Sequence, residues 1–176
     1  MTLSKSVIES LQNMLHDSDL RVYCDSTWGS DNPEHRALIQ HSLNDLKLSK
    51  DQHISISHCQ GAGIFVVSRF PIGVDVEVKE RVTEKVVARI STAEELSNAP
   101  SFSSLWCAKE ATFKALKTYQ QPSVVSAITV GDWQKIDSQV ETFKLMNSAN
   151  FNSPSENRGV CVHTERHSYS FFIFLS

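Results

Sequence analysis

Two carboxylates stand two residues apart in a segment whose pattern predicts a β-strand. Asp75 and Glu77 alternate with the apolar residues Val74 and Val76, so a strand would place the carboxylates on one face and the valines on the other. Positions two apart along a strand are separated by about 6.6 Å, which lets two side chains reach one ion. The pattern predicts an oxygen-ligand site, and the simpler alternative is an acidic strand face exposed to water.

A third carboxylate follows in a segment with helical spacing. The apolar stripe of this helix consists of Phe102, Leu105, Trp106, Phe113 and Leu116. Glu110 lies at the edge of the stripe, and Lys114 stands beside it one turn further on. Lys109 projects into the stripe itself, where an unpaired ammonium would be costly. The alternative is an ordinary Glu110–Lys114 pair on a surface helix.

Together the two segments predict a site for a hard cation next to phosphate groups. Mg²⁺ prefers a few carboxylates, retained waters and phosphate oxygens, and neighbouring lysines suit the phosphates. The sequence offers no paired Cys or His ligands for zinc. Its four cysteines are widely spaced, which favours free thiols in a reducing compartment.

In this order, the two segments resemble the signature of the 4′-phosphopantetheinyl transferases, G-x-D-x-E followed by W-x-x-K-E-x-x-x-K. All seven fixed positions are present: Gly73, Asp75, Glu77, Trp106, Lys109, Glu110 and Lys114. Residues 54–58, Ile-Ser-Ile-Ser-His, are similar to the N-I-S-H-S strand of the surfactin-type branch. The helix expected from Pro33 carries His-Arg-Ala-Leu-Ile, which looks like the H-R-x-L-L helix of the same branch.

The resemblance implies an α+β fold of two pseudo-related halves, with antiparallel sheets and a long helix packed on one of them. The halves would be residues 1–70 and 71–176, joined in one compact unit with a shortened first half. It also implies a reaction: the 4′-phosphopantetheine group of coenzyme A passes to a serine hydroxyl of an apo acyl or peptidyl carrier protein, and 3′,5′-adenosine diphosphate leaves. A monomer is expected, because one chain carries both the strand at residues 54–58 and the strand with Asp75 and Glu77.

The resemblance assigns roles to residues as well. Asp75, Glu77 and Glu110 would hold Mg²⁺, or Mn²⁺ in its place, with Glu110 as the base and Lys114 as the group that stabilises the leaving phosphate. Coenzyme A, the co-substrate, would contact Arg36, Ser57, His58, Lys109 and Lys114. From the residues alone, His58 is more simply a structural histidine and Arg36 a surface arginine. The cations that the family usually carries before this helix, and the G-K-P segment after it, are absent.

The composition fits one compact domain and disfavours one class of binding partner, nucleic acid. The 176 residues are 40% hydrophobic and 21% charged, and the net charge of −3 argues against nucleic acid as the main partner. The longest apolar run, residues 171–175, is too short to span a membrane, and the N-terminus lacks a signal-peptide core, so a cytoplasmic location is expected. A cationic patch for an acidic carrier is predicted at Lys79, Arg81, Lys85 and Arg89; the interleaved Glu80 and Glu84 make a solvated helix face the alternative.

Two other functions fit the same residues. One is a module that binds coenzyme A or a carrier without transferring anything, and the other is a metal-dependent phosphohydrolase acting on a small diphosphate.

Periodicity and turn residues predict the remaining elements. Helices are expected at 4–15, 33–46, 83–90, 92–97 and 101–118, and strands at 20–24, 54–58, 64–67, 127–130, 140–146, 159–164 and 169–175. Capping boxes are expected at Ser6/Glu9 and Thr92/Glu95. His163 and His167 are expected to flank a turn between strands and to be structural.

Overall fold

The computed structural model describes residues 3–29 and 33–175, apart from the side chains of Pro33, His35 and Arg36. The first part of the chain forms a three-stranded antiparallel sheet in the order β1-β3-β2, from β1 (Arg21–Asp25), β2 (His53–Cys59) and β3 (Ala62–Ser68). Gly61 lies in the turn between β2 and β3 with φ +78°, a conformation that favours glycine.

The second part forms a five-stranded antiparallel sheet in the order β4-β8-β7-β6-β5. Its strands are β4 (Ile72–Val78), β5 (Val130–Lys135), β6 (Val140–Leu145), β7 (Asn157–His163) and β8 (His167–Phe174). Three α-helices connect β4 to β5: α3 (Glu84–Val87), α4 (Ala93–Asn98) and the long α5 (Phe102–Ala115). Short 3₁₀ helices are η1 (Lys79–Arg81), η2 (Leu116–Thr118), η3 (Val125–Ala127) and η4 (Ser148–Phe151).

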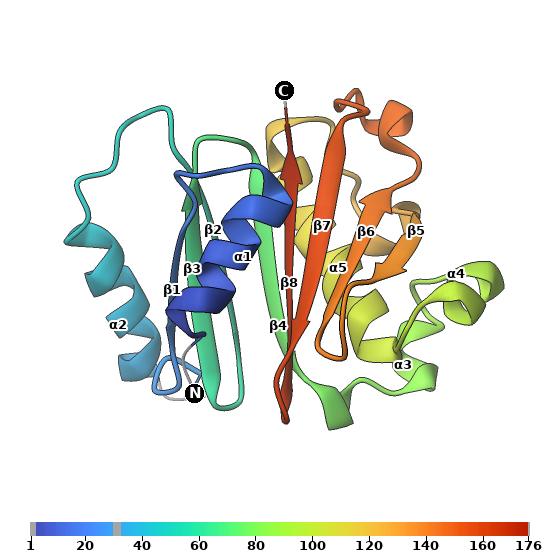
Figure 1. Ribbon diagram of the computed structural model, residues 1–176, viewed down its shortest axis with the longest axis horizontal. Coiled ribbons are helices and arrows are strands. Elements are labelled where there is room, and N and C mark those ends of the chain that lie inside the picture. Colours follow the sequence, from blue (N-terminus) through green and yellow to red (C-terminus); the bar gives the residue numbers. More distant parts are fainter. Residues whose placement is uncertain (1–2, 30–32, 176) are drawn as a thin grey trace.

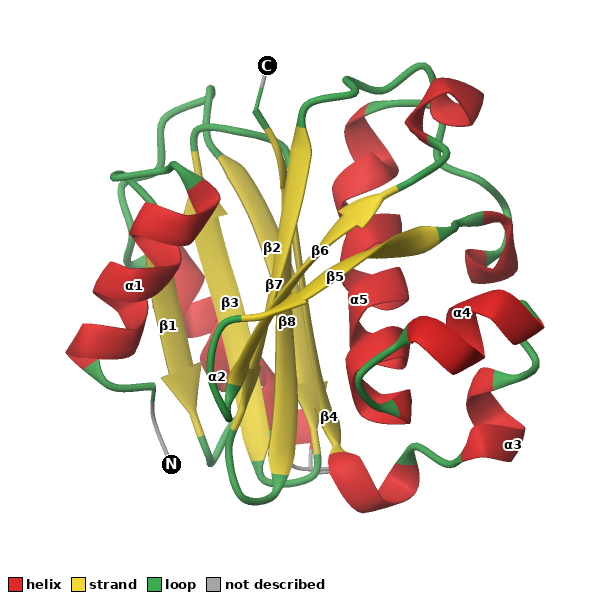
Figure 2. Ribbon diagram, turned by 45° about the vertical axis from the view of Figure 1, so that its right-hand side comes forward, coloured by secondary structure: helices red, strands yellow, loops and turns green. Residues whose placement is uncertain are grey.

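Among the described residues, three apolar cores hold the helices on the sheets, and Figure 1 shows how these helices and strands are arranged. The first lies between the two sheets and α1 (Lys5–Leu15), where Leu11 and Leu15 meet Val66 and Val76. The second joins α5 to the five-stranded sheet, and the third joins α2 (Pro33–Asn44) to Phe65 and Val67 of β3. Figure 2 shows the strands between α1 on one side and α5 on the other.

The two sheets meet along β2 and β4 through side chains. Ser55 Oγ accepts a hydrogen bond from the Val74 N–H (3.0 Å), and Ser57 Oγ accepts one from the Val76 N–H (3.3 Å). These N–H groups lie on the edge of β4 that no strand pairs, because β4 is hydrogen-bonded only to β8. The two serines therefore satisfy an open strand edge and join the sheets there.

The predicted fold class, α+β with antiparallel sheets and a long helix packed on one of them, is confirmed. Two elements differ from expectation. The strand expected at 127–130 begins at Val130 and runs to Lys135; the residues just before it form η3, and Asp132, with φ +53°, interrupts the alternation by which a strand is detected. The helix expected at 83–90 spans only Glu84–Val87.

Of the two expected capping boxes, the one at α4 forms and the one at α1 does not. The capping box of Thr92 and Glu95 forms as predicted. At the first helix, Ser4 is the cap in place of Ser6, and it accepts a hydrogen bond from the Val7 N–H.

Candidate functional site

The strand β4 presents Gly73, Asp75 and Glu77 toward α5, because alternation turns Val74 and Val76 into the core on the other side. The helix packs directly on the glycine: a Cβ added at Gly73 would lie 1.8 Å from the carbonyl oxygen of Ala111. Only glycine permits this contact between strand and helix. The close packing brings the carboxylates of β4 next to the polar edge of α5.

Asp75 is the centre of this arrangement and is only 5% exposed. Its Oδ1 accepts hydrogen bonds from Ser57 Oγ and from Lys114 Nζ, each at 2.8 Å. Lys114 also donates to the carbonyl oxygen of Val74 (3.0 Å), which fixes its ammonium against the strand. The second oxygen, Oδ2, is buried and has no hydrogen-bond partner in the described part of the chain. Leaving such a group unpaired costs about 1–3 kcal/mol, so this oxygen is suited to a ligand.

Glu77 and Glu110 complete the acidic group. Burial raises the pKa of Glu77, and the Asp75 carboxylate raises it further. Burial and Asp75 raise the pKa of Glu110 in the same way, while Lys114 opposes the shift. The Asp75 carboxylate and the Lys114 ammonium therefore both act on Glu77 and Glu110 through their charges. Three negative groups with one positive partner favour a bound cation.

The side chains of the acidic group are of the chemical type that binds a hard divalent ion. Among the described residues, no three His, Cys, Asp or Glu side chains are gathered as a preformed metal cage. The acidic group nevertheless offers only oxygen ligands, including the unpartnered Asp75 Oδ2, and oxygen ligands are those that Mg²⁺ and Mn²⁺ accept.

Lys109 points elsewhere. Its side chain is 0% exposed, and its Nζ lies 2.8 and 2.9 Å from the two carboxylate oxygens of Glu95 on α4. Glu95 also accepts hydrogen bonds from the N–H groups of Thr92 and Val130. A buried ion pair thus offsets the cost of placing this lysine in the apolar stripe, and its ammonium is enclosed rather than directed at a ligand.

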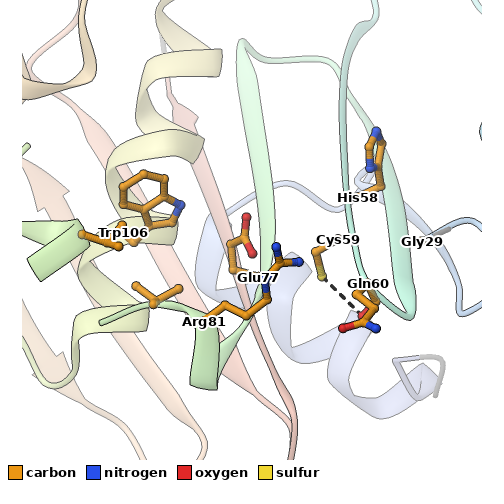
Figure 3. A pocket seen from close by; sticks show the side chains of 9 residues that line it. Gly29, His58, Cys59, Gln60, Glu77, Arg81 and Trp106 are labelled. Carbon is orange, nitrogen blue, oxygen red and sulfur yellow. Dashed lines mark hydrogen bonds between the residues drawn. The ribbon is translucent and has the colours of Figure 1, made fainter. Parts of the chain in front are cut away.

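A cavity of about 330 Å³ opens beside Glu77, between the ends of β2 and β4, η1, α3 and α5 (Figure 3). Its walls are formed by Gly29, His58, Cys59, Gln60, Glu77, Arg81, Val82, Val86 and Trp106. Of the residues predicted to contact the coenzyme, His58 is exposed and lines this cavity. Ser57 is 8% exposed, and its hydroxyl is engaged with Asp75. The side chain of Arg36 lies outside the described residues.

Sequence reasoning missed the positions of two arginines near the cavity. The sequence predicts Arg81 as one cation of a patch for an acidic carrier, and the structure has it lining the cavity together with Glu77. Arg166, in the turn between β7 and β8, donates to the side-chain oxygen of Gln60 (3.2 Å). The predicted patch is also divided, because the Lys79 ammonium donates to the carbonyl oxygen of Thr164. No local pattern signals these contacts, which join segments distant in sequence.

Comparison with known proteins identifies the family. A model of the 4′-phosphopantetheinyl transferase superfamily matches residues 71–169, which is more than half of the chain and includes both carboxylate segments. No curated protein matches the chain. Within the described residues, no helix is long and apolar enough to cross a membrane. Members of this superfamily use coenzyme A as substrate, generally with a divalent metal, and act on carrier proteins. The chain belongs to the 4′-phosphopantetheinyl transferase superfamily.

Proposed function

We propose that the protein transfers the 4′-phosphopantetheine group of coenzyme A to a serine of an apo acyl or peptidyl carrier protein in a Mg²⁺-dependent reaction. The observation that carries the proposal is the group formed by Asp75, Glu77, Glu110 and Lys114 at the contact of β4 with α5. A module that only binds coenzyme A has no need for a carboxylate of raised pKa beside a fixed ammonium.

Asp75, Glu77 and Glu110 are the residues that would hold Mg²⁺, with Mn²⁺ as a substitute. When bound, the metal neutralises negative charge that develops on the phosphate oxygens as the anhydride breaks. The unpartnered Asp75 Oδ2 supports this assignment. His58, on the cavity wall, is proposed to contact the coenzyme.

Glu110 is proposed as the base. Its raised pKa makes it a stronger proton acceptor than an ordinary glutamate, which suits removal of the proton from a carrier serine. The serine oxygen then bonds to the phosphorus that carries pantetheine, and the bond from this phosphorus to the bridging oxygen breaks. Lys114 stabilises the leaving 3′,5′-adenosine diphosphate, because its ammonium is held by Asp75 and the Val74 carbonyl oxygen rather than being free to turn away.

We further assign the chain to the surfactin-type branch, with a shortened first half, acting as a monomer in the cytoplasm. Support comes from the β2 strand, whose Ile-Ser-Ile-Ser-His segment lies beside the metal strand, and from the cavity, which one chain encloses with residues of both sheets. The halves 1–70 and 71–176 then correspond to the three-stranded and five-stranded sheets.

Intact-mass analysis tests the function directly. The purified protein is incubated with coenzyme A, Mg²⁺ and apo carriers from fatty-acid, polyketide and peptide synthesis. Transfer adds the mass of phosphopantetheine to one carrier, and the gain disappears with a chelator. Release of 3′,5′-adenosine diphosphate without carrier would indicate a phosphohydrolase instead. Binding of coenzyme A without turnover of any carrier would indicate a binding module.

A further inference from the structure

The motif lysines leave the cavity short of positive charge. Lys109 is enclosed by its pair with Glu95, and Lys114 is engaged with Asp75. The acidic group carries three negative charges, which a divalent cation and Lys114 would just neutralise. With the acidic group neutralised in this way, a further cation on the cavity wall would strengthen the attraction for a phosphate anion that the metal and Lys114 provide.

Arg81 is positioned to supply that charge. It follows directly from β4 at the end of η1 and lines the cavity together with Glu77, His58 and Trp106. Figure 3 shows its guanidinium next to the Glu77 carboxylate, on the side of the cavity where Cys59 lies. Its positive charge lowers the pKa values of both groups against the effect of burial, which agrees with this placement.

The Arg81 guanidinium is free of side-chain hydrogen bonds and ion pairs within the described part of the chain. Among the described side chains, none forms a hydrogen bond or an ion pair with it, although Glu77 is near. An arginine fork that is near a carboxylate but unpaired retains all five N–H donors for a ligand. By contrast, Arg166 already donates to the side-chain oxygen of Gln60, a residue of the cavity wall.

We propose that Arg81 binds the pyrophosphate of coenzyme A, next to the carboxylates of β4 and α5. The proposal rests on the proposed function and adds to it a residue outside the signature motifs. The pyrophosphate is chosen over the 3′-phosphate because Arg81 lies next to Glu77, and a metal held by Glu77 would bring the reacting phosphates to this place. A planar, bidentate donor suits two adjacent phosphate oxygens.

Calorimetric titration of the full chain with coenzyme A and Mg²⁺, without carrier, tests this role. Arg81→Gln should weaken coenzyme A binding by about 10-fold or more, the scale of a lost charge-assisted hydrogen bond. Arg81→Lys, which keeps the charge but not the fork, should recover part of the affinity. Arg89→Gln, a matched change at an exposed arginine just beyond α3, should bind within 2-fold of the wild type. Thermal midpoints should stay equal, since no described side chain pairs with Arg81.

A second ligand identifies the phosphate. With dephospho-coenzyme A, which lacks the 3′-phosphate, Arg81→Gln should lose affinity by the same factor as with coenzyme A. A loss seen only with coenzyme A would assign Arg81 to the 3′-phosphate and overturn the proposal. Unchanged affinity for both ligands with a raised carrier KM would make Arg81 a carrier contact and overturn it as well. If the wild type transfers phosphopantetheine, either result leaves the proposed function standing; if it binds no coenzyme A, both proposals fail.

Discussion

Replacing Lys109 with methionine separates a structural role from a role in coenzyme binding. Lys109→Met keeps the length and volume of the side chain but removes the ammonium that lies 2.8 and 2.9 Å from the two oxygens of Glu95. The Glu95 carboxylate, whose side chain is 4% exposed, would then be an uncompensated buried charge. Breaking a buried pair in this way costs about 3–5 kcal/mol in the free energy of unfolding. The N–H groups of Thr92 and Val130 still bind Glu95, so we expect about 3 kcal/mol, the lower end.

The assay is urea unfolding of the metal-free protein, followed by calorimetric titration with coenzyme A. For a domain of this size, such a loss lowers the thermal midpoint by about 6–12 °C. Lys117→Met, at an exposed position one residue beyond the end of the same apolar stripe, is the control and should change the free energy of unfolding by less than about 0.5 kcal/mol. The folded Lys109→Met variant should bind coenzyme A with wild-type affinity. A variant with unchanged stability and lost coenzyme affinity would refute the structural role and restore Lys109 to the binding site.

Three further predictions concern the acidic group. Asp75→Ala should abolish the gain in coenzyme A affinity that Mg²⁺ gives, and calorimetric titration with and without chelator measures it; a persisting gain would mean that Asp75 does not hold the metal. Glu110→Gln should retain much of the coenzyme A affinity but lose about 10²-fold in kcat, measured by carrier mass; turnover near the wild-type rate would exclude Glu110 as the base. A bound cation favours ionised carboxylates, so Mg²⁺ should expel protons from Glu77 and Glu110 below their raised pKa values and cease to do so above them. Titrations in two buffers of different ionisation enthalpy should show this release at about pH 5 but not at pH 8; equal release at both would contradict the assignment.

The periodic elements around the site could be predicted because their signals are local. Val74 and Val76 alternate with Asp75 and Glu77, and this alternation alone determines which side chains share a face of β4. The apolar stripe of α5 likewise locates Glu110 and Lys114. What brings the two together is Gly73, whose missing Cβ lets α5 approach the strand. Each feature lies within one short segment, so the sequence is sufficient to identify it.

The contacts that close the site depend on distant pairs and could not be predicted in the same way. Lys109 stands out in the sequence as a charge in an apolar stripe, but nothing there identifies Glu95 as its partner, because the capping box already accounts for that glutamate. Arg81 looks like one cation of an exposed series until η1 places it at the cavity. The bounds of strand β5 were predicted wrongly, because the bulge at Asp132 breaks the alternation of its residues.

Ser57 shows how the two parts of the chain combine in one site. Its hydroxyl oxygen accepts the Val76 N–H of the open edge of β4, and its hydroxyl hydrogen is donated to Asp75 Oδ1. One side chain of the three-stranded sheet thus binds both the backbone and the Asp75 carboxylate of the five-stranded sheet. With Lys114 on the same Oδ1, the Asp75 side chain is held from both sides while Oδ2 is left without a partner. Two donors on one oxygen leave the other for the ligand of the proposed function, so the serine of β2 acts by positioning Asp75.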